Sequence, residues 1–248
     1  MPIYGLDIET DTTVDGLDPA AARILTVALS SDEVDELFTG PEPDLLVELD
    51  HRLAAMPPGV IATWNGAAFD LPFIADRAAM HGCALGLRLE HDPSIVVRGR
   101  NLPGHRGAYR AAWHHHSHLD AFRVYRGDVG PALRISCGLK SIARFVGLHA
   151  IEVDRSQIHG LSQEALHAYA SSDARLARVL TERRWASASR AIDREPTDPA
   201  IPVDHSRRIA AMRATAEAGG HRLPRQVEVG TDPRRVAPPT SGSDPIAG

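Results

Sequence analysis

Apolar and polar positions along the chain predict strands first and then alternating helices and strands. Residues 2–9 and 24–30 are apolar and β-prone, and residues 34–39 give a third short run of the same kind. Leucines then recur at helical spacing over residues 45–53, and the helix they predict ends at Pro57-Pro58-Gly59.

A second strand-to-helix transition follows this break. Residues 60–64 form a short apolar run, Asn65-Gly66 is a turn signal, and residues 69–82 return to helical spacing. Pro72 is compatible with the first turn of that helix. The order β-β-β-α-β-α predicts an α/β fold, a central mixed β-sheet flanked by α-helices.

Helical patterns also fill the later part of the chain. Residues 139–146 predict a short helix that ends at Gly147. Ser162 is a candidate N-cap for a long helix from about residue 163 to residue 191. We therefore expect one domain over residues 1–192.

Residues 93–118 interrupt this regular pattern and predict an insertion, either a loop or an irregular hairpin. The segment holds five histidines, four arginines and no acid. The arginines are Arg98, Arg100, Arg106 and Arg110. A solvated surface loop is the first interpretation, and a loop that contacts phosphates is a close second. A metal site at His114–His118 ranks third, since consecutive residues of an extended segment point to opposite faces.

Composition changes again over residues 193–248, which carry repeated Pro, Gly, Ser and Arg. We expect a mostly disordered tail there, with a short helix at 204–218 at most. The chain as a whole is 43% hydrophobic and has a net charge of −5, so a polyanion must be held by a local patch or by metal ions. Cys83 and Cys137 form no disulfide framework, and no export signal or membrane span is present, which favours the cytoplasm.

Two acids lie on one face of the first predicted strand. Asp7 and Glu9 are two residues apart, so their side chains project together, away from Leu6 and Ile8. Two buried acids on one face are costly unless a positive group pairs with them, and a divalent metal ion is the simplest partner. The alternative is that Asp7 and Glu9 lie at the end of the strand and are simply solvated.

Three further residues complete a candidate metal site. Asp70 lies at the start of a predicted helix, and Tyr169 and Asp173 are one turn apart on the last one. Each also has a simpler interpretation. Asp70 could be a helix N-terminal acid, and Tyr169 and Asp173 could be a hydrogen-bonded pair. Together the four acids form a set of hard oxygen ligands that suits two Mg²⁺ or Mn²⁺ ions and phosphoryl transfer. Tyr169 would orient the attacking water, because a phenol with a pKa of about 10 is a poor general base.

At these residues the sequence resembles the DEDD, or DnaQ-like, superfamily of 3′–5′ exonucleases, which have a ribonuclease H-like fold. The motifs are Asp7-Ile8-Glu9-Thr10, Asn65-x-x-x-Phe69-Asp70 and Tyr169-x-x-x-Asp173. Ala168 stands where the histidine subtype would have its histidine, and His167 is out of register. The resemblance therefore implies the tyrosine subtype, DEDDy.

The resemblance extends to the proofreading domain of family B DNA polymerases, through residues 64–74, Leu119-Asp120 and Gly138-Leu139-Lys140. It covers about residues 1–190 and implies a free-standing 3′–5′ exonuclease. Such an enzyme releases nucleoside 5′-monophosphates from the 3′ end of DNA, here single-stranded, with two divalent metal ions. The alternatives are an exoribonuclease or oligoribonuclease and a non-catalytic nucleic-acid-binding module.

The motifs also contain candidate substrate contacts. These are Thr10, Asn65 and Phe69, although Asn65 is equally a turn residue and Phe69 a core aromatic residue. Asp120 lies outside the set of four acids, and we favour a helix-capping role for it. The partner expected is nucleic acid, with no membrane; protein partners are not predicted.

Overall fold

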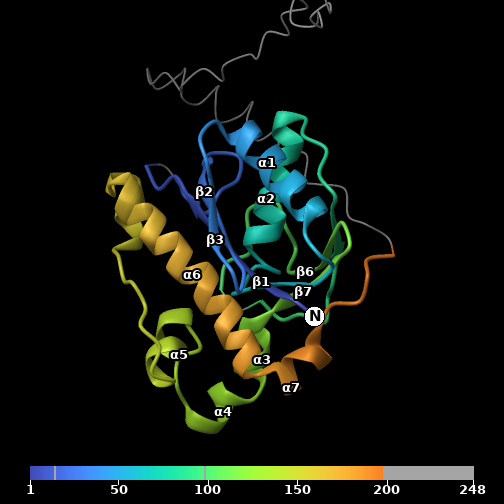
Figure 1. Cartoon of the computed structure of the whole chain (residues 1–248), viewed down its shortest axis with the longest axis vertical. Coiled ribbons are helices and arrows are strands. Elements are labelled where there is room, and N and C mark those ends of the chain that lie inside the picture. Colours follow the sequence, from blue (N-terminus) through green and yellow to red (C-terminus); the bar gives the residue numbers. More distant parts are fainter. Residues whose placement is uncertain (14, 98, 198–248) are drawn as a thin grey trace, which may run out of the picture. The chain divides into compact units, whose positions relative to one another are not determined.

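The protein is built on a seven-stranded mixed sheet (Figure 1), seen in a computed structural model that describes residues 1–197 apart from 14 and 98. The strands are β1 (Ile3–Thr10), β2 (Ile24–Ser30), β3 (Asp35–Thr39), β4 (Val60–Thr63), β5 (Leu87–His91), β6 (Tyr109–Trp113) and β7 (His116–Asp120). Their order in the sheet is β3-β2-β1-β4-β7-β6-β5. Strands β1, β4 and β7 run parallel, and every other pairing is antiparallel.

Helices cover both faces of this sheet (Figure 1). They are α1 (Glu42–Ala55), α2 (Asp70–His81), α3 (Ala121–Gly127), α4 (Val129–Leu133), α5 (Leu139–Phe145), α6 (Gln163–Arg183) and α7 (Trp185–Ala188). Two 3₁₀ turns, η1 (Arg155–Gly160) and η2 (Ser189–Ala191), complete the described part. Helices α1 and α2 lie on one face, and α6 crosses the other against β1 and β2.

Alternation along β1 divides its side chains between these two faces. Leu6 and Ile8 enter the main hydrophobic core, which also contains leucines of α1 and Phe73 of α2. Gly5 lies beneath α6, where an added Cβ would stand 1.9 Å from the carbonyl oxygen of Ala174. Only glycine permits this close approach of the strand to the helix. Among the described residues, no helix is long and apolar enough to cross a membrane.

The mixed sheet with flanking helices confirms the predicted α/β architecture, and the early strands and helices lie close to their predicted positions. The side chain of Ser162 accepts a hydrogen bond from Ala165 N at 3.2 Å, so the predicted N-cap of α6 is confirmed. The predicted extent of that helix, to residue 191, is wrong. Helix α6 ends at Arg183, and Trp185 then packs against the small hydrophobic cluster around Val60 and Leu119.

Residues 93–118 are only partly irregular. The segment between β5 and β6 is a long connection, but β6 and β7 are regular, largely buried strands. The predicted hairpin is confirmed, because β6 and β7 pair antiparallel. The expectation of a solvated loop fails for these strands because their side chains, including those of His116 and His118, are largely buried. His116 Nε2 lies 2.8 Å from Leu53 O, and His115 Nε2 lies 2.7 Å from Met56 O, at the C-terminal end of α1. His114 pairs with Asp50, so these three side chains bind three different partners and form no metal cluster.

The expected tail begins with a residue that is anchored in the sheet. Asp193 Oδ2 lies 2.6 Å from His118 Nδ1, and Asp193 N donates to His118 O at 2.8 Å. Arg123 adds an ion pair at 3.2 Å. The helix predicted at 204–218 and the rest of the tail from residue 198 lie outside the described residues.

Candidate metal centre and nucleic-acid site

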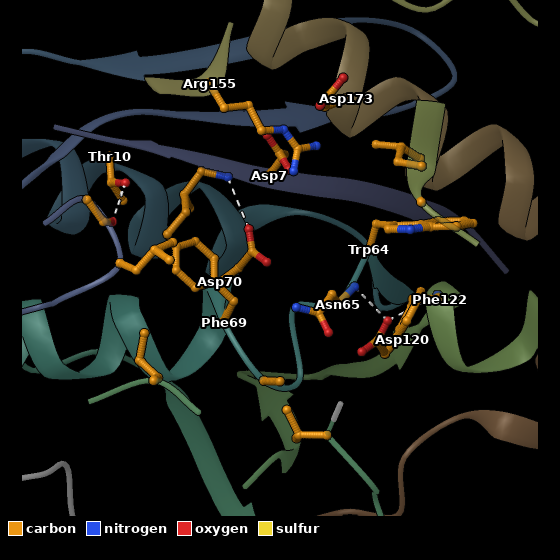
Figure 2. A pocket seen from close by; sticks show the side chains of 18 of the residues that line it. Asp7, Thr10, Trp64, Asn65, Phe69, Asp70, Asp120, Phe122, Arg155 and Asp173 are labelled. Atoms are coloured by element: carbon orange, nitrogen blue, oxygen red, sulfur yellow. Dashed lines mark hydrogen bonds between the residues drawn. The ribbon is translucent and has the colours of Figure 1, made fainter. Parts of the chain in front are cut away.

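Three carboxylates from two distant parts of the chain meet on the α6 face of β1. Asp7 and Glu9 project together from β1, as alternation predicts, and Asp173 faces them from α6 (Figure 2 labels Asp7 and Asp173). One ligand oxygen of each lies within 4.8 Å of the others. Among the residues the structure describes, this is the one group of three or more such side chains able to hold a metal ion.

Asp70 joins the site from the second motif. It is the first residue of α2, as predicted, and its Oδ1 accepts a hydrogen bond from Ile8 N at 3.2 Å (Figure 2). Asp70 lies outside the group of three but lines the same pocket. The backbone between Asp7 and Glu9 is therefore tied directly to the fourth acid.

Crowding gives these acids an unusual affinity for protons. Burial, together with the nearby carboxylates of Glu9 and Asp70, raises the pKa of Asp7 well above its ordinary value. Burial raises the pKa of Glu9 to about 8 and that of Asp70 to about 7. Nearby cationic side chains lower the pKa values of Asp7 and Glu9 but do not outweigh these effects, and a divalent cation would supply further positive charge.

Tyr169 and Lys140 border the acids. Tyr169 is buried one turn before Asp173 on α6, and burial and the charge of Glu9 raise its pKa above 10. Its phenol therefore stays protonated near neutral pH. The Lys140 ammonium forms an ion pair with Asp173 and lies 4.5 Å from the centre of the Tyr169 ring. Burial lowers the pKa of Lys140 to about 8.

Arg155 is a further cation at the centre, one that the sequence did not point to. It extends from η1 toward Asp7 (Figure 2), interacts with the Tyr169 hydroxyl, and acts electrostatically on Asp7 and Glu9. Lys140 could have been singled out as the one lysine among 27 basic residues, within the Gly138-Leu139-Lys140 motif. Arg155 carries no such signal, because only the packing of η1 brings it here.

The acids open into a pocket of about 740 Å³. Its walls include aromatic side chains, an apolar segment over residues 95–97, and arginines from α3, from η1 and from the β5–β6 connection. The arginines are Arg100, Arg123, Arg126 and Arg155. Arg126 donates to Val96 O at 3.4 Å and lies over the Phe122 ring at 5.5 Å, so it joins α3 to the long connection. The pocket therefore combines an acidic floor with cationic and apolar walls.

The predicted contacts Thr10, Asn65 and Phe69 all line this pocket, and each also has a structural role. The Thr10 hydroxyl donates to Gly16 O at 2.6 Å. Asn65 has φ 73°, a left-handed turn conformation that asparagine tolerates. Phe69 packs against the core beside Phe73. The simpler interpretations of Asn65 and Phe69 thus hold alongside their position in the site.

Of the arginines predicted to contact substrate, some line the pocket and others do not. Arg100 lines the pocket and pairs with Asp15 at 3.6 Å. Arg106 and Arg110 are absent from the pocket lining, and Arg110 instead pairs with Glu90 and Asp92 at 3.3 and 3.4 Å. Arg98 lies outside the described residues. Arg123 and Arg126 of α3 occupy the pocket wall instead.

Asp120 is the N-cap of α3, as favoured from the sequence. Its Oδ1 accepts hydrogen bonds from Phe122 N at 3.1 Å and from Asn65 N at 2.8 Å. Asp120 also lines the pocket. Its hydrogen bonds join the β4–α2 turn, which carries Asn65, to α3.

Two comparisons with known proteins agree with this architecture. The chain is 33% identical over 152 residues to the catalytic polypeptide of DNA polymerase epsilon from Schizosaccharomyces pombe. That match covers 56% of this chain but only 6% of the relative, so the chain spans a small part of the relative's length. The family model of the RNase H superfamily matches residues 5–170, which confirms the predicted ribonuclease H-like fold. The chain belongs to the RNase H superfamily.

Proposed function

We propose that the protein is a metal-dependent 3′–5′ exonuclease of the DEDDy type that acts on single-stranded DNA. The observation that carries the proposal is the convergence of Asp7, Glu9 and Asp173 within 4.8 Å beside Asp70. Superfamily membership supports nuclease activity. The direction of digestion and the preference for DNA rest on the motif order and on the polymerase relative.

The donor set fits divalent metal ions of the hard class. All four side chains offer carboxylate oxygens. Burial raises the pKa values of Asp7, Glu9 and Asp70, and neighbouring carboxylates of the set add to the rise at Asp7 and Glu9, a repulsion that cations would relieve. Asp7, Glu9, Asp70 and Asp173 would hold two Mg²⁺ or Mn²⁺ ions. When bound, the ions supply the positive charge that a phosphodiester displacement needs at its attacking and leaving oxygens.

The remaining residues of the centre position the reacting groups. Tyr169 is buried, and burial and the charge of Glu9 keep its hydroxyl protonated, so it orients the attacking water by a hydrogen bond rather than by removing its proton. The arginines of the pocket wall attract the phosphates of the strand. Apolar and aromatic surface, including Phe69 and Phe122, offers stacking contacts for its bases.

Digestion of matched strands tests this proposal. A 5′-labelled single-stranded DNA, the same sequence as RNA, and a circular single-stranded DNA are incubated with Mg²⁺ or with Mn²⁺. We expect a ladder that shortens from the 3′ end of the linear DNA, nucleoside 5′-monophosphate products and an intact circle. Faster digestion of RNA would favour the exoribonuclease alternative, a cut circle an endonuclease, and binding without digestion the non-catalytic module.

A further inference from the structure

Arg155 differs from many arginines of the protein because its charge acts on the acidic centre without forming an ion pair. Arg77, Arg110 and Arg178, for example, each contact a carboxylate within 4.0 Å. Within the described part of the chain, no carboxylate lies that close to the Arg155 guanidinium. The guanidinium interacts instead with the Tyr169 hydroxyl and lines the pocket. It therefore remains available to bind an anion.

The backbone that carries Arg155 is held on both sides. Asp154 caps the first turn of η1 by accepting from Ser156 N at 3.0 Å, and Ile158 is buried. At the far end, His159 Nδ1 lies 2.8 Å from the Thr12 hydroxyl, and His159 N donates to the same oxygen at 3.3 Å. Thr12 lies just after β1, so η1 is attached to the strand that carries Asp7 and Glu9.

We propose that Arg155 is a catalytic residue that binds a non-bridging oxygen of the scissile phosphate. The inference rests on the proposed function. A guanidinium presents planar, parallel N–H groups that match two phosphate oxygens, and its charge is not lost near neutral pH. Placed beside Tyr169, it draws the phosphate toward the phenol that orients the water. It also stabilises the charge that develops on the phosphate in the transition state.

A simpler role for Arg155 is to hold the Tyr169 hydroxyl in place, without touching the substrate. The two roles differ in how binding responds when the phosphate loses its charge. A DNA strand with a methylphosphonate at its last linkage replaces one charged non-bridging oxygen with a methyl group. Binding is measured by fluorescence anisotropy with Ca²⁺, for wild type, Arg155→Gln and the control Arg144→Gln. Arg144 is exposed on α5 and pairs with Glu152, so its variant makes the same charge change away from the pocket.

We expect wild type and Arg144→Gln to bind the methylphosphonate strand about tenfold more weakly than the natural strand. Arg155→Gln should bind the natural strand about tenfold more weakly than wild type. Its further loss of affinity on the modified strand should be clearly smaller than the loss in wild type, with the remainder due to the metal ions. With Mn²⁺, its kcat/KM on the natural strand should fall about 10²-fold or more, at an unchanged unfolding temperature.

An equal methylphosphonate penalty in wild type and Arg155→Gln would overturn the proposal, even with reduced activity, and would assign Arg155 to positioning Tyr169. Full activity of Arg155→Gln in Mn²⁺ would overturn it as well. These outcomes are distinct from failure of the proposed exonuclease function, in which wild type itself would show no metal-dependent digestion.

Discussion

The carboxylate of Asp70 accepts a hydrogen bond from the backbone amide of Ile8, 3.2 Å away, across 62 residues of sequence. The bond fixes the start of α2 against the strand that carries Asp7 and Glu9. Asp70 is thus both a structural acceptor and a candidate metal ligand. Substitutions that separate the two properties test which one the protein uses.

Asp70→Asn keeps an acceptor oxygen for Ile8 N but removes the charge. We expect it to unfold in EDTA at a urea concentration close to that of wild type, and to gain less stability from saturating Mn²⁺. Asp70→Ala also removes the acceptor, so it should lose about 1–3 kcal/mol of unfolding free energy in EDTA. Full stabilisation of Asp70→Asn by Mn²⁺ would exclude Asp70 as a ligand.

The raised pKa values of Glu9, about 8, and Asp70, about 7, predict how metal-free stability depends on pH. The folded protein holds these protons more tightly than the unfolded chain does. Their stabilising effect is therefore complete below about pH 4 and is lost as pH rises through 7 and 8. We expect the unfolding temperature in EDTA to fall between about pH 6 and pH 8.

Two comparisons control this pH experiment. Glu9→Gln should flatten the fall, because the amide has no proton to lose. Saturating Mn²⁺ should reverse it, because deprotonated carboxylates bind the ion more strongly as pH rises. An equally steep fall in Glu9→Gln would assign the pH dependence to other groups.

The Lys140–Asp173 ion pair predicts a loss of stability that metal can restore. Lys140→Met keeps most of the side-chain volume but leaves Asp173 beside Asp7 and Glu9 without its ammonium partner. We expect a loss of about 2 kcal/mol of unfolding free energy in EDTA, and a larger gain from Mn²⁺ than in wild type. Lys140→Arg should lose less unfolding free energy than Lys140→Met, because it keeps a cationic partner for Asp173. Equal gains in unfolding free energy from Mn²⁺ in wild type and Lys140→Met would show that the lysine does not affect the metal site.

The contact between Gly5 and α6 predicts that a single methyl group disturbs the whole centre. A Cβ at residue 5 would stand 1.9 Å from Ala174 O, on the helix that carries Asp173. Gly5→Ala should lose about 3 kcal/mol or more of unfolding free energy. Gly127→Ala is the matched control, because nothing lies within 4 Å of its added Cβ. Similar urea midpoints for the two variants would contradict the close approach.

Local periodicity was enough to predict most of the acidic site. Alternation along one strand placed Asp7 and Glu9 together, and helical spacing placed Tyr169 one turn before Asp173. Both relationships depend only on backbone geometry within a few residues, and the order of elements indicated a mixed sheet.

The remaining features depend on contacts between distant residues, which periodicity does not report. Arg155 reaches the site because His159 contacts Thr12, 147 residues away. The hairpin expected as one alternative for residues 93–118 is present as β6 and β7. The burial of His116 and His118 was not predicted, because both look polar, yet they form hydrogen bonds to Leu53 O, Thr63 and Asp193. Arg123 and Arg126 were not predicted for the same reason, because their place in the pocket wall depends on the packing of α3.

Hydrolysis of DNA from its 3′ end by the carboxylate centre, with divalent metal, can be tested directly. The most direct measurement is the digestion rate of a 5′-labelled single strand in Mn²⁺ by wild type and by Asp7→Asn, each shown to be folded. We expect stepwise shortening from the 3′ end by wild type, no digestion in EDTA, and a rate at least about 10³-fold lower for Asp7→Asn. Equal rates for the two proteins, or digestion that persists in EDTA, would contradict it.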